Sequence, residues 1–290
     1  MGHPCDMDKI LEICKKHNLM LIEDCSHAHG ATYKGKKVGT FGDVGCFSFQ
    51  ANKIVTGGCA GVMITNDQEI YERACLLGHF RNRCFDSVIS EKYSQYSDTG
   101  FGLNYRIHPL ASAIALNHLK DLDNRIKIRN ENLNYLSEKI NELNTCIKAP
   151  ITRDGCFRGA FYGYKPLYFG LEKWGVPAKI YAKALEEEGF SINIPGSKPL
   201  HLLKLFQGGE KDLYSFRGKG KQNLNDYIYY KEGDLPKSEY YYKHTISFPT
   251  FTFVSRDIID KFIEAIKKIE QNKDELIEYC KINGYLEKIN

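Results

Sequence analysis

Four polar residues near the start of the chain have the types and the spacing that a cofactor site would need. The apolar run LMLIE leads into Asp24, and His27 follows three residues later. The run VGCFSF carries Ser48, and Lys53 follows that serine by five residues. A carboxylate at the end of a buried strand needs a partner, because an unpaired buried charge is unfavourable. We therefore expect Asp24 and Lys53 to face one bound group from two sides.

Pyridoxal phosphate has the groups that such a set would bind. Asp24 would stabilise the protonated ring nitrogen, which makes the ring an electron sink. Lys53 would form the Schiff base and its amine would then move protons. His27 would contact the phenolic oxygen and Ser48 would bind the phosphate. Each residue alone also has an ordinary explanation, as a helix cap, a core or surface histidine, a strand hydroxyl or a surface amine.

Three apolar runs of strand length must position these side chains: LMLIE, VGCFSF and GVMIT. Short buried strands with polar residues at their carboxyl ends form the sites of open α/β sheets. We predict a buried strand over Leu19–Glu23. A helix over Asp6–His17, capped by Asp6, would feed directly into it. A second helix is predicted over Asp67–Leu77.

The pattern of predicted helices and strands changes along the rest of the chain. Residues 78–102 are polar, aromatic and irregular, so we expect a long loop there. Long ordered loops are often functional. Further elements are predicted in this order: a helix after Pro109, a helix over 125–143, strands near 161–169, 191–194 and 245–248, a helix over 177–188, a polar loop over 208–233 and a helix after Ser255. The change of pattern predicts a partial cofactor-binding large domain at 1–123 and a small α+β domain at 124–290, with the boundary near Asp123.

Composition excludes several classes of protein. The chain has 290 residues, of which 42% are hydrophobic and 26% charged, and its net charge is only +4. These values are typical of a globular protein, and the short lysine patches argue against nucleic-acid binding. No apolar run has the length of a membrane span, and the start MGHPCDMDKILE lacks the features of a signal peptide. We expect a cytoplasmic protein that binds neither membrane nor nucleic acid.

The ten cysteines contain no CxxC pair. This pattern fits free thiols in a reducing compartment better than a disulfide framework or a zinc site. A metal site built on His27 and His29 is the weaker alternative, because no further ligands lie at useful spacing. We expect no bound metal.

The ordered set resembles the DegT/DnrJ/EryC1/StrS family of sugar aminotransferases, which are fold-type I pyridoxal phosphate enzymes. The family pattern is an acidic pair, a His or Gln, Gly-Ala, Gly-Asp, Ser-Phe and a lysine five residues after the serine. The matching residues here are Glu23-Asp24, His27, Gly30-Ala31, Gly42-Asp43, Ser48-Phe49 and Lys53. TGFGLNYRIHPLASAIALNHLKDLDNRIKIR and the regions around His201 and after Leu235 are similar to the family too, so the resemblance spans nearly the whole chain.

The resemblance implies a fold and a dimer. The fold would be α/β: the C-terminal part of a pyridoxal phosphate transferase large domain, three-layered with a mostly parallel sheet, followed by a smaller α+β domain. Asn104 would reach the cofactor phosphate of the neighbouring subunit and Arg106 would brace that interface, which implies a homodimer. Relatives that act as dehydratases carry histidine in place of the lysine, so Lys53 favours transamination.

The chain departs from the family pattern in three places. Family members start earlier, so we expect that on the order of a hundred residues, about one domain, are missing at the N-terminus. In the family that part supplies a Gly-Thr turn on the phosphate, an aromatic residue on the ring and several strands. Gly58-Cys59-Ala60-Gly61 replaces Gly-Glu-Gly-Gly, and Ser26 replaces a common alanine.

The resemblance implies that the protein transfers an amino group from glutamate or glutamine to a keto sugar or a keto-cyclitol. The sugar would be nucleotide-linked, and the product would serve amino-sugar or surface-glycan synthesis. The alternative is a truncated, non-catalytic remnant with a structural or interaction role. The missing part of the sheet motivates this alternative, because the strand at Leu19 would then expose an apolar edge. A cofactor absorbance band that depends on Lys53 distinguishes the two.

Overall fold

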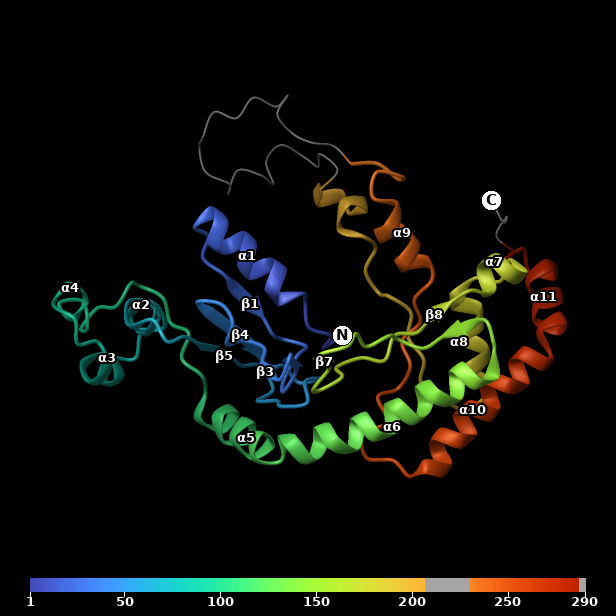
Figure 1. The fold of residues 1–290 in the computed structure, drawn as a ribbon, viewed down its shortest axis with the longest axis horizontal. Helices are drawn as coiled ribbons and strands as arrows, with labels where there is room; N and C mark the ends of the chain where they lie inside the picture. Colours follow the sequence, from blue (N-terminus) through green and yellow to red (C-terminus); the bar gives the residue numbers. More distant parts are fainter. Residues whose placement is uncertain (207–229, 287–290) are drawn as a thin grey trace. The chain divides into compact units, whose positions relative to one another are not determined.

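The computed structural model describes residues 1–206 and 230–286. They form two compact units, each assembled from segments that are distant in the sequence (Figure 1). Unit 1 contains Met1–Leu133, Ile151–Gly163 and Thr250–Phe253. Unit 2 contains the described residues of Asn134–Pro150, Tyr164–Pro249 and Val254–Asn290. Most of the polar loop predicted at 208–233 lies outside the described residues.

Unit 1 is built on a three-stranded sheet with the order β1-β4-β5. β1 (Ile22–Asp24) pairs in parallel with β4 (Val44–Ser48). β4 pairs in antiparallel with β5 (Gly61–Ile64). The α/β fold class is therefore confirmed, and the sheet within the described residues is mixed. The parallel pair brings the carboxyl ends of β1 and β4 to the same edge of the sheet.

A buried glutamate fixes the turn between these two strands. Glu23 is 8% exposed, and its carboxylate accepts hydrogen bonds from the backbone N–H groups of Gly39 (2.7 Å), Phe41 (2.7 Å) and Gly42 (2.8 Å). Three such bonds satisfy a charge that would otherwise be costly to bury. Gly45 is needed nearby, because a Cβ added there would lie 2.4 Å from the Gly39 oxygen. The turn therefore holds β4 beside β1.

A second sheet brings a distant segment back to unit 1. β2 (Thr32–Tyr33) pairs in antiparallel with β3 (Lys36–Lys37) and with β7 (Cys156–Phe157), in the order β3-β2-β7. β7 follows β2 by more than a hundred residues. This pairing places the segment 151–163 in unit 1.

The predicted helices of unit 1 are present. α1 (Met7–His17) leads into β1, and α2 (Gln68–Gly78), α5 (Pro109–Lys120) and the first half of α6 (Leu122–Leu143) follow. The carboxylate of Asp67 caps α2 by accepting a 2.8 Å bond from Ile70 N–H. Asp6 is the N-cap residue of α1, as predicted, but its side chain makes no capping hydrogen bond. Its carboxylate instead accepts a hydrogen bond from the Tyr33 hydroxyl (3.1 Å) and pairs with Lys9.

The loop predicted over 78–102 is wrong, because it contains two short helices, α3 (Arg81–Ser87) and α4 (Glu91–Ser94). A buried carboxylate anchors them to α2: Glu72 accepts from the N–H groups of Ile89 and Ser90 (both 3.0 Å) and from the Ser90 hydroxyl. A small core forms around it from Cys75, Leu76, Cys84, Val88 and Tyr93. These helices are too short to show periodicity in the sequence.

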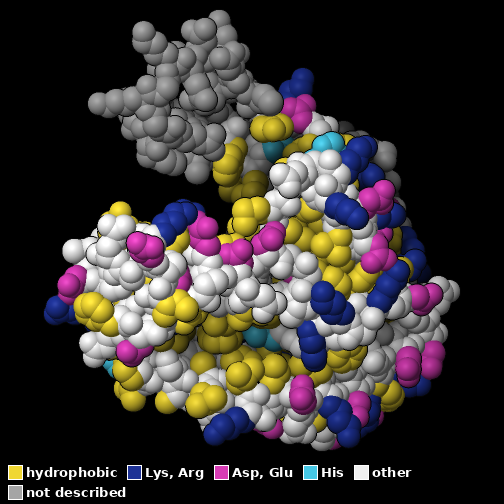
Figure 2. Space-filling model, turned by 60° about the vertical axis from the view of Figure 1, so that its left-hand side comes forward, with side chains coloured by type: hydrophobic (Ala, Val, Ile, Leu, Met, Phe, Trp, Pro, Cys, Tyr) yellow, Lys and Arg dark blue, Asp and Glu magenta, His cyan; other side chains and the backbone are white. Residues whose placement is uncertain are grey.

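The strand predicted as buried over Leu19–Glu23 is exposed. The strand begins only at Ile22, and Leu19, Met20 and Ile22 are each more than half exposed. β1 is an outer strand of the described sheet, so one face and one edge remain open. Figure 2 shows hydrophobic side chains at the surface among charged ones. Glu23 is the buried residue of this strand.

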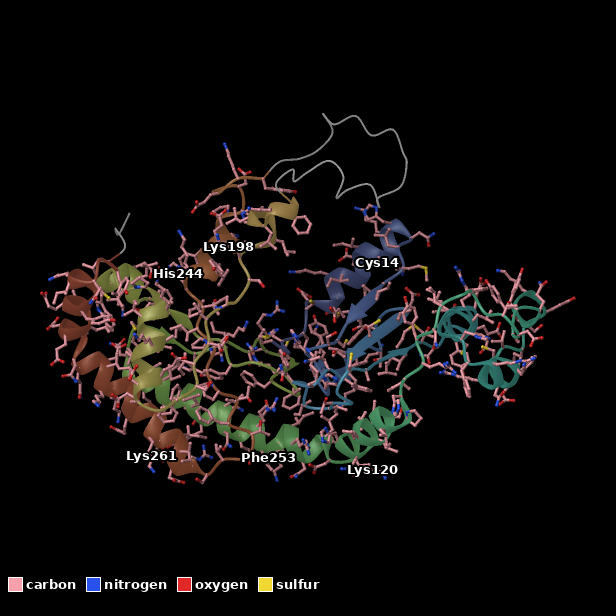
Figure 3. The ribbon with its side chains drawn as sticks, turned by 180° about the vertical axis from the view of Figure 1, so that it is seen from behind. Cys14, Lys120, Lys198, His244, Phe253 and Lys261 are labelled. Atoms are coloured by element: carbon pink, nitrogen blue, oxygen red, sulfur yellow. The ribbon has the colours of Figure 1, made fainter. Side chains whose placement is uncertain are left out.

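Unit 1 extends past Asp123, the boundary that the sequence pattern predicts, to Leu133. The reason lies in the first half of α6, where Ile126 packs in one core cluster with Ile54 and Val55. The short segment 250–253 returns to the same helix. Phe253, labelled in Figure 3, has its ring centroid 5.4 Å from the Arg125 guanidinium carbon.

Unit 2 contains mainly helices with little strand. β6 (Ile147–Lys148) pairs with β8 (Leu167–Tyr168) in antiparallel. The strands predicted near 191–194 and 245–248 appear only as isolated bridges, including Asn193 to Ser247. The helices are α7 (Gly170–Trp174), α8 (Ala178–Glu187), η1 (Leu200–Leu202), η2 (Lys204–Phe206), α9 (Pro236–Lys243), α10 (Arg256–Gln271) and α11 (Lys273–Ile282).

Glu23→Gln should lower the free energy of unfolding by about 2 kcal/mol. One amide oxygen would replace a carboxylate that accepts three hydrogen bonds, and the buried amide NH₂ group would gain no acceptor. Urea denaturation of the chain measures the change. Glu12→Gln on the exposed face of α1 is the control and should change stability by less than about 0.5 kcal/mol. Equal losses in both variants would contradict this role of Glu23.

Candidate active site

Asp24 ends β1 with an exposed, ionised carboxylate. Its Oδ1 accepts a 3.0 Å hydrogen bond from the backbone N–H of Ser26. Hydrogen bonds from the Ser26 hydroxyl and backbone lower the pKa of Asp24, and the positive charges of His27 and Lys53 add to this effect. Ser26, which departs from the family pattern, therefore helps to keep this carboxylate charged.

Lys53 lies in the turn after β4 and is partly buried. Its backbone N–H donates to the carbonyl of Gln50 (2.9 Å), which closes the turn. Partial burial lowers the pKa of the amine, whereas the charge of Asp24 acts in the opposite direction. A lowered pKa increases the fraction of neutral amine, which is the form that attacks a carbonyl carbon.

The structure brings Asp24 and Lys53 to one edge of the sheet. β1 and β4 run in parallel, Asp24 ends β1 and Lys53 follows β4. The charge of each residue influences the pKa of the other.

His27 lies beside this pair with its ring stacked on an aromatic residue that the sequence pattern does not indicate. The rings of His27 and Tyr162 are 4.0 Å apart between centroids and inclined by 8°. The Lys53 amine lies 4.0 Å from the centroid of the same Tyr162 ring. Tyr162 reaches the site through the β7 segment, and no periodicity or motif around it marks that approach.

Ser48 is the last residue of β4 and is half-buried. Its hydroxyl accepts a 3.3 Å hydrogen bond from the backbone N–H of Gln50, the residue whose carbonyl closes the Lys53 turn. The following turn also keeps its backbone bonds: Phe49 N–H donates to Ala60 (2.8 Å) and Gly57 N–H donates to Phe49 (2.8 Å). The Gly-Cys-Ala-Gly sequence therefore still closes this turn.

Asn104 and Arg106 lie in the extended stretch before α5, where both are exposed. Asn104 Oδ1 accepts hydrogen bonds from the backbone N–H (3.3 Å) and the Nε of Arg106 (3.0 Å). The two side chains thus form one pair at the surface. Their role across a subunit interface stays a prediction.

His29 is a further titratable group that the predicted set did not include. It is 4% exposed, and its ring lies 5.7 Å from Phe47 and 6.0 Å from Phe49 between centroids. Within the described part of the chain, its Nε2 atom has no hydrogen-bond partner. Burial, followed by the charge of Lys53, lowers the pKa of His29 to about 4. The imidazole is therefore neutral at neutral pH.

Residues 1–206 and 230–286 contain neither a metal-binding cluster nor a membrane-spanning helix. Over 1–206 and 230–286, no group of three or more His, Cys, Asp or Glu side chains could hold a metal ion. None of the helices described there is both long and apolar enough to cross a bilayer.

Known proteins share the fold and the sequence pattern of this chain. A solved aminotransferase from Psychrobacter cryohalolentis has the same fold, with a TM-score of 0.71 and 24% identity over 93% of this chain and 66% of that one. The profile of the DegT/DnrJ/EryC1/StrS aminotransferase family matches residues 1–267. The chain belongs to this family.

Two relatives with described activities are similar over part of the chain. GDP-perosamine synthase from Escherichia coli O157:H7 is 42% identical over 142 residues, which is 49% of this chain and 37% of the relative. L-glutamine:2-deoxy-scyllo-inosose aminotransferase from Streptoalloteichus tenebrarius is 32% identical over 207 residues, 69% of this chain and 47% of the relative. The chain thus matches about half, or less, of the length of these two relatives.

Asp24→Asn should make Lys53 react about two- to threefold faster with acetic anhydride at pH 8. Loss of the opposite charge lowers the pKa of Lys53, so that more of the amine is neutral. Peptide mass spectrometry reports the modification at Lys53 alone. Asp67→Asn is the matched control, because asparagine also caps α2 and should leave Lys53 unchanged. An unchanged rate in Asp24→Asn would show that the two charges do not interact.

Stability should depend on pH through His29. Its pKa is about 4 in the folded chain against 6.5 for an unperturbed histidine. As the pH falls, His29 therefore binds a proton in the unfolded state before it does so in the folded state. The contribution of neutral His29 to stability is complete above pH 6.5 and is lost between pH 6.5 and 4. Between pH 7 and 4 the free energy of unfolding of the unmodified chain should fall by up to about 3 kcal/mol more than that of His29→Phe. Urea denaturation at each pH measures this difference. Equal losses of stability in the two proteins would contradict the effect of His29.

Proposed function

We propose that this chain is the part of a pyridoxal phosphate-dependent aminotransferase that carries the Schiff-base lysine. The observation that carries the proposal is the placement of the Asp24 carboxylate and the Lys53 amine at one edge of the sheet, within electrostatic reach of each other. Membership of the aminotransferase family supports it. The residues fit the cofactor, because an ionised carboxylate, a partly buried amine and an aromatic stack match its ring nitrogen, its aldehyde and its flat ring.

The residues of this chain would share the chemistry as follows. Asp24, held ionised by Ser26, keeps a proton on the ring nitrogen. Lys53 would hold the cofactor through its amine, and the same amine, once free, would move a proton at the substrate carbon. Ser48 binds phosphate, and His27 holds the phenolic oxygen. When bound, pyridoxal phosphate supplies the electron sink that stabilises negative charge at that carbon.

The substrate of the complete protein would be a keto sugar, nucleotide-linked, or a keto-cyclitol, with glutamate or glutamine as the amino donor. The names of the two relatives support this class, since one is a GDP-sugar synthase and the other a glutamine-dependent inosose aminotransferase. The role would be amino-sugar or surface-glycan synthesis.

Assembly and location are part of the proposal. The exposed pair Asn104–Arg106 would reach the second subunit of a homodimer. The open apolar face of β1 would pack against the portion of a longer protein that the relatives contain beyond the matched region. All ten cysteines have free thiols, which supports a location in the reducing cytoplasm.

Addition of pyridoxal phosphate to the protein in its full natural length should produce an absorbance band near the edge of the visible range. Lys53→Ala should abolish the band, because the proposal assigns the covalent bond with the cofactor to the Lys53 amine. Lys36→Ala, which removes an exposed lysine of β3, is the control and should keep it. Absence of the band from the unmodified protein would instead support the non-catalytic remnant.

A further inference from the structure

The segment that follows β7 is fixed against the loop that carries His27. Ala160 N–H donates a 2.8 Å hydrogen bond to the carbonyl of His29. Gly159 has φ +57°, and a Cβ added there would lie 2.2 Å from the nitrogen of Ala31, so only glycine allows this approach. The contact is backbone against backbone, and it defines where the next residues of the segment lie.

α6 holds the same segment from another side. Asn130 Nδ2 donates to the Gly159 carbonyl (2.7 Å), and an Arg129 guanidinium nitrogen donates to the Ala160 carbonyl (2.9 Å). Phe161 then adopts φ +43°, a conformation that non-glycine residues rarely adopt, and is 2% exposed. Such a conformation persists only where the surroundings determine it. Tyr162 therefore follows a rigid turn.

The ring of Tyr162 contacts two of the predicted site residues. It stacks on His27 with 4.0 Å between centroids and 8° between planes, and the Lys53 amine lies 4.0 Å from its centroid. An ammonium ion over a tyrosine face is attracted by the ring quadrupole. The stack holds the imidazole in one plane. One side chain thus orients both a predicted cofactor contact and the predicted Schiff-base lysine.

We propose that Tyr162 is a positioning residue of the active site, which fixes the His27 imidazole and the Lys53 amine in the orientation that the cofactor requires. This inference rests on the proposed function. It assigns to the segment after β7 a direct part in the site, in addition to the strand–turn stretch that carries Asp24 and Lys53. Tyr162 acts through its aromatic face, so phenylalanine should replace it and an aliphatic side chain should not.

The first test uses the cofactor-free protein. Tyr162→Leu keeps apolar bulk beside Lys53 but removes the ring face that attracts the ammonium group. Loss of this attraction should lower the pKa of the Lys53 amine. Acetylation of Lys53 at pH 8, followed by peptide mass spectrometry, should become about two- to fivefold faster. Tyr162→Phe should react like the unmodified protein. An unchanged rate in Tyr162→Leu would show that the ring does not act on the amine.

The second test measures pyridoxal phosphate binding by absorbance in the full-length protein. Tyr162→Leu should bind about tenfold more weakly, because both His27 and Lys53 lose their orientation. Tyr162→Phe should bind normally. The matched control is Phe157→Leu in β7, an aromatic residue of the same returning segment, which should also bind normally. Urea denaturation of each variant separates a loss of binding from a loss of folding.

The outcomes separate this inference from the proposed function. If the unmodified protein binds cofactor and Tyr162→Leu matches it in affinity and in Lys53 reactivity, the positioning role of Tyr162 is wrong while the proposed function stands. If the unmodified protein binds no cofactor, the proposed function fails and the role of Tyr162 in an active site fails with it. A faster acetylation in Tyr162→Leu would then report only a contact between ring and amine.

Discussion

Parallel pairing of β1 with β4 is the interaction on which the proposed site depends. It places the residues after both strands at one edge of the sheet, so that Asp24 and Lys53 approach each other although 29 positions separate them. The pairing depends in turn on Glu23, whose buried carboxylate binds three N–H groups of the intervening turn. The two adjacent acidic residues thus differ in their surroundings: Glu23 is buried and holds the turn, whereas Asp24 is exposed at the edge of the sheet.

Charge and burial act in opposite directions around Lys53. Burial lowers the pKa of its amine, whereas the Asp24 carboxylate and the Tyr162 ring both stabilise the ammonium form. An amine in this balance can be neutral when it attacks a carbonyl and can still accept a proton afterwards. His29 stays neutral in the same region because burial and the lysine charge both disfavour its protonation.

Sequence reasoning found the residues that lie close together along the chain. Asp24, His27, Ser48 and Lys53 fall within one stretch, and order and spacing were enough to predict them, although their binding of a cofactor stays a prediction. Tyr162 could not be predicted, because it lies more than a hundred residues from Lys53 and arrives through the pairing of β7 with β2. Local competition explains other differences from prediction: the Tyr33 hydroxyl and Lys9 bind the Asp6 carboxylate, and Glu72 gives α3 and α4 an anchor that no periodicity reveals.

Asp24 and Lys53 are proposed to act on one cofactor, with Lys53 as its covalent attachment. Borohydride reduction of the full-length protein after incubation with pyridoxal phosphate tests this proposal most directly, because reduction makes the bond to the amine permanent. Peptide mass spectrometry should find the added pyridoxyl group on Lys53 in the unmodified protein and much less of it in Asp24→Asn. A label spread over surface lysines, with Lys53 unmodified, would contradict the account.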